Sequence, residues 1–403
     1  MLDETLLDAP EDLARADVRG LLRGAAQAGA RVRTGLRHAT EAGLDALRPE
    51  GRPRALLVAG PGPATACVAD LLAAFTNGAV PVTRLGPTGN HAATGALRWS
   101  LPGWAGPVDL LLLVTPDGTE GGLTALVDQA YRRGCTVVAV TPQGTPLADA
   151  LGESRGLAVP IAPGPAEPVW HDGPPAPASP PGQEARPGPA TLAGQPLGAP
   201  GTFWALLTPL LVLTDRLGLT RSGPQALAAL ADRLDEVAER CGPAVALYSN
   251  PGKTLAAELS GALPLLWSEG AVAGAAARHW AAVCATLPGR PALAAELPEA
   301  MAAHGALLAG PFAPGTGSDD FFRDRVEEPE AMRPRVVLLR EGPPGNDSAT
   351  VQARDLTYAQ ETPLSELEPA EGSSPLQAAA ELIATADFCS VYLTLADTDS
   401  PWT

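Results

Sequence analysis

The sequence predicts an α/β protein in which mostly parallel sheets are flanked by helices in three layers. The stretch 108–142 reads as apolar strand, Pro/Gly turn, amphipathic helix and second apolar strand. The same order of strand, turn and helix recurs at 54–75 and again at 264–286. Four consecutive leucines, Leu110 to Leu113, suit a strand buried on both faces, as strands of parallel sheets are. Alternation of this kind indicates βαβ units.

The turn inside the stretch 108–142 is the first candidate binding feature. Pro116 and Gly118 end the preceding strand, and a helix is expected to begin near Glu120 and to end at Gly134. The turn 115–121 therefore presents hydroxyls and backbone N–H groups at a helix N-terminus. Such a position favours anions, phosphate above all, because unpaired N–H groups and the helix dipole both attract negative charge.

The chain is predicted to divide into five segments. Two helical patterns at the N-terminus are expected to cover one face of the first sheet, whose strands we place at 54–60, 81–85, 109–114 and 136–141. A stretch dominated by Pro, Gly and Ala follows and is expected to be a linker. The expected segments are 1–52 (N-terminal helices), 53–155 (first subdomain), 156–200 (linker), 201–242 (connecting helices) and 243–403 (second subdomain with a C-terminal helix).

The second half repeats the alternation with shorter elements. A pair of helices is expected from Phe203 onward, with a turn at 222–224. Strands or extended pieces are then predicted at 244–249, 264–267, 291–296 and 335–340, with a further candidate strand at 351–356. A final helix is expected over 374–393, because its leucine and alanine positions share one face.

Composition excludes several function classes. The 45 acidic and 28 basic residues give a formal charge of -17, so nucleic acid and anionic membranes are unexpected partners. Five cysteines without metal-ligand spacing indicate buried thiols in a reducing cytoplasm. The start of the chain lacks the apolar region of a signal peptide, and the best apolar run, 203–213, is too short to span a membrane. We expect a cytoplasmic protein without metal or cofactor.

Three apparent motifs fail on inspection. The turn GPGPAT at 60–65 has Thr65 where a dinucleotide-binding fingerprint requires glycine. The segment SNPGKT at 249–254 ends as a P-loop does, but Leu247 stands where the P-loop needs its first glycine. His171 and Asp172 have no third ligand nearby in the sequence and are expected to face solvent.

Taken together, the two halves resemble a known family. VAGPGPATACVADLL looks like a glycine-rich first strand, turn and helix, and the stretch 101–141 resembles a segment with a phosphate loop of the type SYSGNTEET. ELPEAMAAH at 296–304 and SSPLQAAAELIATADFCSVYL at 373–393 match later segments in order and spacing. The chain thus resembles the SIS (sugar isomerase) fold, and more closely the bifunctional phosphoglucose/phosphomannose isomerase family in its actinobacterial form. The resemblance implies two SIS-type subdomains.

What the resemblance implies is a protein that binds hexose 6-phosphates and interconverts aldose and ketose. Such isomerases use a carboxylate to move a proton between C1 and C2, a histidine for ring opening and an arginine to stabilise the enediolate. Of the family's phosphate ligands, Thr119 is retained and Thr65 stands at or next to the serine of the first turn. The two loop serines, by contrast, fall at Val114 and Pro116, with Thr115 one residue away as a substitute. The resemblance implies no metal or cofactor, and isomerases of this kind are homodimers. The expected phosphate-binding residues are Thr65, Thr115, Gly118 and Thr119.

The catalytic positions of the family are substituted in this chain. The arginine falls at Gly201, the glutamate base at Thr286 and the histidine at Ala302. Glu299 and His304 lie close by in the sequence as possible substitutes, together with Glu296. Three readings therefore stay open: an isomerase with an altered site, a non-catalytic SIS protein that acts as sugar-phosphate sensor, regulator or scaffold, and a protein that acts only through a partner surface.

Overall fold

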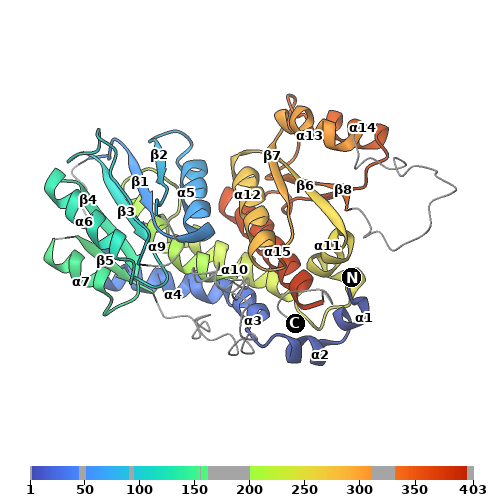
Figure 1. The fold of residues 1–403 in the computed structure, drawn as a ribbon, viewed down its shortest axis with the longest axis horizontal. Helices are drawn as coiled ribbons and strands as arrows, with labels where there is room; N and C mark the ends of the chain where they lie inside the picture. Colours follow the sequence, from blue (N-terminus) through green and yellow to red (C-terminus); the bar gives the residue numbers. More distant parts are fainter. Residues whose placement is uncertain are drawn as a thin grey trace, which may run out of the picture. The chain divides into compact units, whose positions relative to one another are not determined.

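The computed structural model describes residues 2–44, 51–89, 95–154, 156–161, 200–309 and 332–396. The chain forms two compact units, one made of Gln27–Ala231 and the other of Met1–Ala26 with Asp232–Thr403. Each unit contains one parallel sheet flanked by helices, so the predicted α/β class with two mostly parallel, three-layer subdomains is confirmed (Figure 1).

The first sheet is entirely parallel, with strand order β2-β1-β3-β4-β5. Its middle strand is the predicted run of leucines, and every residue of that strand is buried. In this order the connections from β1 and from β3 lead to opposite sides, so the topological switch point lies between these two strands. Ligands of open α/β sheets bind at such a point. The strands are β1 (Leu56–Ala59), β2 (Val82–Leu85), β3 (Leu110–Val114), β4 (Thr136–Thr141) and β5 (Leu157–Pro160).

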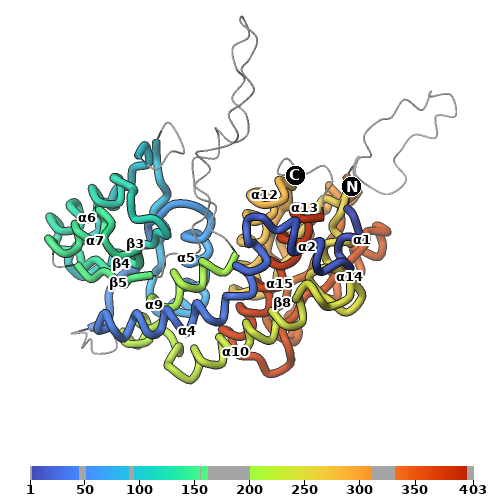
Figure 2. The backbone as a smooth tube through the Cα atoms, turned by 90° about the horizontal axis from the view of Figure 1, so that it is seen from below, coloured from blue at the N-terminus to red at the C-terminus, as the bar shows by residue number. Residues whose placement is uncertain are grey.

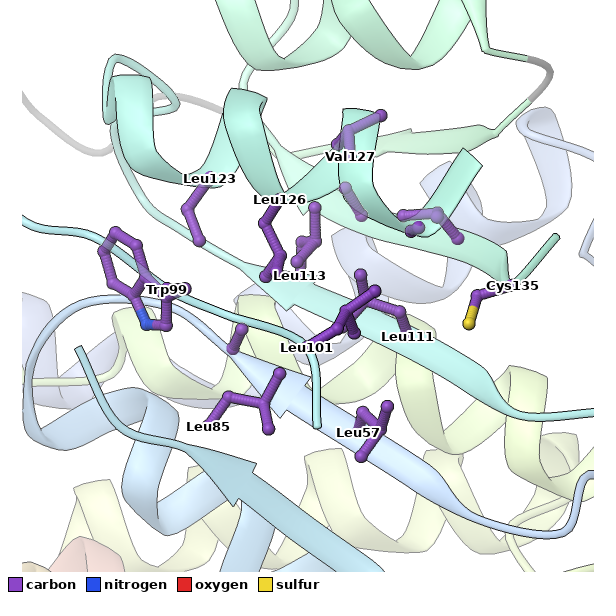
Figure 3. Packing of buried hydrophobic residues seen from close by; sticks show 14 of the residues in the cluster. Leu57, Leu85, Trp99, Leu101, Leu111, Leu113, Leu123, Leu126, Val127 and Cys135 are labelled. Carbon is purple, nitrogen blue, oxygen red and sulfur yellow. The ribbon is translucent and has the colours of Figure 1, made fainter. Parts of the chain in front are cut away.

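Successive side chains of β1 and β3 point to opposite faces of the sheet, so the core of this unit lies on both faces. Leu57, Leu111 and Leu113 pack with buried residues of α6 and α7 and with Trp99 (Figure 3). The opposite face is covered by α5, α4 and α9, and α4 runs beside α9 (Figure 2). These helices are α4 (Ala28–Glu41), α5 (Gly62–Thr76), α6 (Gly121–Arg133), α7 (Pro146–Glu153) and α9 (Thr202–Arg216).

The second sheet is also parallel, with strand order β7-β6-β8-β9. Buried side chains of β6 and β8, including Trp267, pack against α13 and α14 on one face, while α11 and α12 cover the other, with α15 packed against both of them. The strands are β6 (Ala262–Glu269), β7 (Leu293–Glu296), β8 (Arg333–Arg340) and β9 (Leu364–Leu367). The helices are α10 (Pro224–Arg240), α11 (Pro251–Leu259), α12 (Ala271–Thr286), α13 (Glu299–Ala309), α14 (Thr350–Ala359) and α15 (Pro375–Ala396).

The first helices of the chain differ from the expected arrangement. We expected residues 1–52 to cover the first sheet, whereas residues up to Ala26 cluster with the second unit. The backbone N–H of Asp3 donates to the carbonyl of Ala396 at 2.8 Å, and a carboxylate oxygen of Asp8 accepts from the N–H of Leu247 at 2.7 Å. The helices concerned are α1 (Glu4–Leu7), α2 (Pro10–Ala16) and α3 (Leu21–Ala26).

Two predicted strands are helical instead. The segment 244–249 carries a single 3-10 turn, η2 (Leu247–Ser249), because the buried ammonium of Lys253 binds the carbonyls of Pro243 and Val245 at 2.8 and 2.7 Å. Val245, which lies inside the predicted strand, thus has the Lys253 ammonium as a partner for its carbonyl instead of a neighbouring strand. The segment 351–356 lies within α14, whose buried Ala353 and Thr357 have helical spacing.

The first residues of the expected linker belong to a strand instead. Residues 157–160 form the edge strand β5, and of the rest of 156–200 only residues 156, 161 and 200 are described, so His171 and Asp172 lie outside the described residues.

One described helix, α15, is long and apolar enough to cross a membrane by composition alone. The fold buries 94% of its most apolar window, as it would a core helix. The run 203–213, which we had named as the best apolar candidate, lies within α9.

Candidate functional site

The turn between β3 and α6 is held by the pair Thr115 and Glu120, both buried. The Thr115 hydroxyl lies 2.8 and 2.9 Å from the two carboxylate oxygens of Glu120 and donates its proton to this group. The same hydroxyl oxygen accepts from the backbone N–H groups of Asp117 and Gly118, at 3.2 and 3.0 Å. The hydroxyl therefore links the carboxylate to the N–H groups of the turn.

Gly118 has the backbone that the turn requires. Its φ of +75° lies in the left-handed region, where residues with a Cβ are strained. A Cβ at this position would approach the hydroxyl oxygens of Thr141 and Thr145 to 2.4 and 2.6 Å. Glycine is thus needed both for the conformation and for the close packing of the turn on the end of β4.

Burial is the main influence on the Glu120 carboxyl. Desolvation raises its pKa above the ordinary value, and the neighbouring charge of Asp117 acts in the same direction. Hydrogen bonds from Thr115 and from the backbone of Glu120 and Gly118 oppose the rise. The carboxylate thus lies within reach of the N–H groups that the sequence predicted would receive an anion.

The four predicted phosphate ligands differ in their exposure. Thr115 and Gly118 are buried in the turn, whereas Thr119 is exposed two residues before α6 begins. Thr65 lies in the first turns of α5, 1% exposed, and its hydroxyl donates to the carbonyl of Pro61 at 2.8 Å. The same hydroxyl lies 3.4 Å from the carbonyl of Val114, the residue before Thr115. The structure therefore gathers Thr65, Thr115 and Gly118 around the carboxyl end of β3 and leaves Thr119 as the exposed residue of the four.

The positions that correspond to the catalytic residues carry no acid or base. Gly201 is the buried residue before α9, with a φ of 89°. The hydroxyl of Thr286, at the end of α12, donates to the carbonyl of Ala282 at 2.9 Å. Ala302 is an exposed residue of α13. No proton acceptor suited to aldose–ketose chemistry stands at any of the three.

The two proposed substitutes do not form a unit. His304 is buried, and its Nδ1 accepts from the indole N–H of Trp267 at 3.0 Å, while burial lowers its pKa. Glu299 is exposed in the first turn of α13. Five residues of helix place the two side chains about 140° apart around the axis. Among the described residues, no hydrogen bond or ion pair joins Glu299 to His304.

Three glutamates lie at strand ends of the second sheet; Glu296 was named from the sequence as a possible substitute, whereas Glu269 and Glu341 were not predicted as site residues. Glu296, at the end of β7, forms an ion pair with Arg278 of α12, and both side chains are about half exposed. Glu341 accepts from the N–H groups of Val272 and Ala273 at the start of α12, at 2.6 and 3.3 Å. Glu269 accepts from the N–H of Ala349 at 2.9 Å and from the hydroxyls of Ser348 and Thr350 at the start of α14.

A sequence signal for two of these glutamates existed. Glu269 and Glu341 each end an apolar strand and precede glycine, a position where a carboxylate reaches the N-terminus of a neighbouring helix. Within the part of the chain that the structure describes, no group of three or more His, Cys, Asp or Glu side chains is arranged to hold a metal ion.

Comparison with known proteins supports the fold of both units. Residues 248–401 match the family model described as the bacterial phospho-glucose isomerase C-terminal SIS domain. A comparison with curated proteins found no significant match.

Solved structures resemble the chain over nearly its whole length. A predicted phosphosugar isomerase from Silicibacter pomeroyi is 15% identical, with 93% of this chain and 96% of that chain covered and a TM-score of 0.55. The C-terminal domain of glucosamine-fructose-6-phosphate aminotransferase from Francisella tularensis is 10% identical, with coverages of 94% and 98% and a TM-score of 0.56. A hypothetical protein from Thermus thermophilus is 15% identical, with coverages of 98% and 92% and a TM-score of 0.57. The chain is therefore an SIS-fold protein that resembles phosphosugar isomerases, and its C-terminal part matches the C-terminal SIS domain of bacterial phosphoglucose isomerases.

Proposed function

We propose that this chain binds a hexose 6-phosphate, with the phosphate at the turn between β3 and α6. The observation that carries the proposal is this turn itself, where Gly118 adopts a left-handed conformation and Thr119 is an exposed residue two positions before α6 begins. The helix dipole and the N–H groups of the first turn of α6 favour an anion there. The likeness to phosphosugar isomerases supports a sugar phosphate as that anion.

We further propose that the chain does not turn over its ligand through the positions used by the family. Gly201, Thr286 and Ala302 offer neither a base nor a cation. Losing a positioned acid–base group typically costs a factor of about 100 to 10,000, and losing the charge stabiliser costs about as much. Such a protein would act as a sugar-phosphate sensor, regulator or scaffold.

Isomerisation by an altered site is the second candidate, favoured by the half-exposed pair of Glu296 and Arg278 at the carboxyl end of β7. A carboxylate and a guanidinium are the two groups that enediol chemistry needs, one to move the proton and one to hold the developing charge. Incubation with glucose, mannose or fructose 6-phosphate, followed by sugar analysis, separates the candidates. Turnover that exceeds a heat-inactivated control and is lost in Glu296→Gln would establish the second candidate and end the first.

The binding proposal is tested by calorimetric titration with glucose 6-phosphate and fructose 6-phosphate, with glucose as the uncharged comparison. Thr119→Ala removes a hydroxyl that would face the phosphate, so we expect about tenfold weaker binding, the equivalent of one hydrogen bond to a charged group. Thr136→Ala is the matched control, because Thr136 is an exposed threonine at the opposite, amino end of β4. Absence of binding to wild type, or equal effects of the two substitutions, would contradict the proposal.

Two further expectations belong to the same proposal. A homodimer, as the resemblance implies, would be seen by light scattering at twice the chain mass of 41.1 kDa. We expect the protein in a reducing cytoplasm, in keeping with five buried cysteines that form no disulfide among the described residues.

A further inference from the structure

The Glu120 carboxylate is already bonded to Thr115, a side chain of the β3–α6 turn that was expected to bind an anion. Its side chain is 1% exposed and has Thr115 as its hydroxyl donor. Thr115 and Gly118 are two of the residues expected to bind phosphate. Thr115 donates its hydroxyl proton to Glu120, and the N–H of Gly118 donates to the same hydroxyl. The hydroxyl expected to bind an anion thus already has a carboxylate of the chain itself as its acceptor.

The chemistry of this carboxylate opposes an external anion in two ways. A hydroxyl has one proton, and the Thr115 proton points to Glu120, so a phosphate oxygen would receive it only after the carboxylate moved. Two negative charges that share one hydroxyl donor also repel each other at this short range. A phosphate and an ionised Glu120 therefore exclude one another from the turn.

We propose that Glu120 is an internal competitor that keeps the β3–α6 turn closed, and that a phosphate binds there by displacing this side chain. The inference rests on the proposed function, because it concerns the same site. It adds a regulatory contact: affinity for the sugar phosphate is set by the exchange between Glu120 and the ligand. Elsewhere in the chain, the carboxylates of Glu341 and Glu269 accept from N–H groups in the first turn of α12 and directly before α14.

Glu120→Gln is the central test, because the amide keeps an oxygen that accepts from Thr115 and removes the charge. We expect glucose 6-phosphate and inorganic phosphate to bind this variant at least tenfold more tightly than wild type in calorimetric titration. Asp117→Asn is the matched control: Asp117 contributes a second negative charge in the same turn but is partly exposed, with only its backbone bonded to Thr115. Its effect should stay below about threefold, since water screens it.

The outcomes separate the inference from the proposed function. Wild-type binding that Glu120→Gln leaves unchanged, or that both variants raise equally, overturns the inference while the function stands. If neither the wild type nor either variant binds glucose 6-phosphate or inorganic phosphate, the function and the inference are overturned together. Thr119→Ala combined with Glu120→Gln should lose the gained affinity, which places the ligand at this turn.

Folding of the variant is part of the test. Circular dichroism and thermal unfolding without ligand should show Glu120→Gln to be folded, and Glu120→Ala provides a second variant without the side-chain oxygens. A failure of both to fold would contradict the proposal, because it would make the carboxylate an indispensable part of the turn instead of a replaceable occupant.

Discussion

At the scale of the residue, the β3–α6 turn depends on one glycine and one hydroxyl. Gly118 supplies a positive φ and leaves space for the hydroxyls of Thr141 and Thr145, while Thr115 joins the Glu120 carboxylate to two backbone N–H groups. Sequence patterns predicted the turn, its glycine and its helix correctly. They could not predict that the hydroxyls of Thr65 and Thr115 would bind protein atoms, because that depends on which atoms the fold brings close to the end of β3.

Gly118→Ala should destabilise the protein more than Gly144→Ala does. Both glycines have positive φ, of +75° and +69°, so each substitution brings a backbone strain of about 1–2 kcal/mol. Only at Gly118 would the new Cβ also meet other atoms, whereas nothing lies within 4 Å of one at Gly144. Chemical denaturation should show the difference, and equal losses would mean that the turn relaxes to accept a methyl group.

At the scale of the element, buried charges hold helix ends and strand ends in place. Glu381 of α15 is 4% exposed and binds Arg233 and Arg240 of α10, at 2.7 and 2.9 Å, and the N–H of Ala370 at 2.7 Å. This single carboxylate connects the second half of α10, the segment after β9 and the first turns of α15. Such contacts are long-range in sequence, so residue patterns gave no sign of them.

Glu381→Gln should lower the free energy of unfolding by about 3 kcal/mol, because it leaves the mostly buried guanidinium of Arg233 without its buried partner charge. Glu236→Gln is a suitable control. Glu236 pairs with the same Arg233 at 3.0 Å, one helical turn away, but its side chain is 59% exposed. Its loss should cost less than about 1 kcal/mol. Urea denaturation measures both, and similar values would show that Glu381 is not energetically distinct from a surface charge.

At the scale of the whole molecule, all five cysteines are buried and none forms a disulfide in the described structure. Burial raises the pKa of Cys284 to about 12 and that of Cys241 to about 11, and it raises the pKa of Cys389 well above its ordinary value. Since the thiolate is the reactive form, these thiols are both covered and protonated near neutral pH. The thiols are therefore part of the packing.

A thiol reagent such as Ellman's reagent should label the native protein far more slowly than the unfolded one. In guanidinium chloride all five thiols should react at the rate of a free cysteine, and a reducing agent should leave the melting temperature unchanged. Rapid labelling of one thiol in the folded protein would reveal an accessible cysteine that the packing does not predict.

The sequence alone determined the α/β class, the order of most strands and helices, and the place of the anion-type turn, because these follow from local periodicity and from Gly and Pro positions. Tertiary structure decided the rest. Lys253 turned a predicted strand into a 3-10 turn by binding its neighbours' carbonyls, and Glu120 was drawn into the turn expected to receive phosphate. Both outcomes depend on which polar groups are buried together, since a buried charge must find partners wherever the fold provides them.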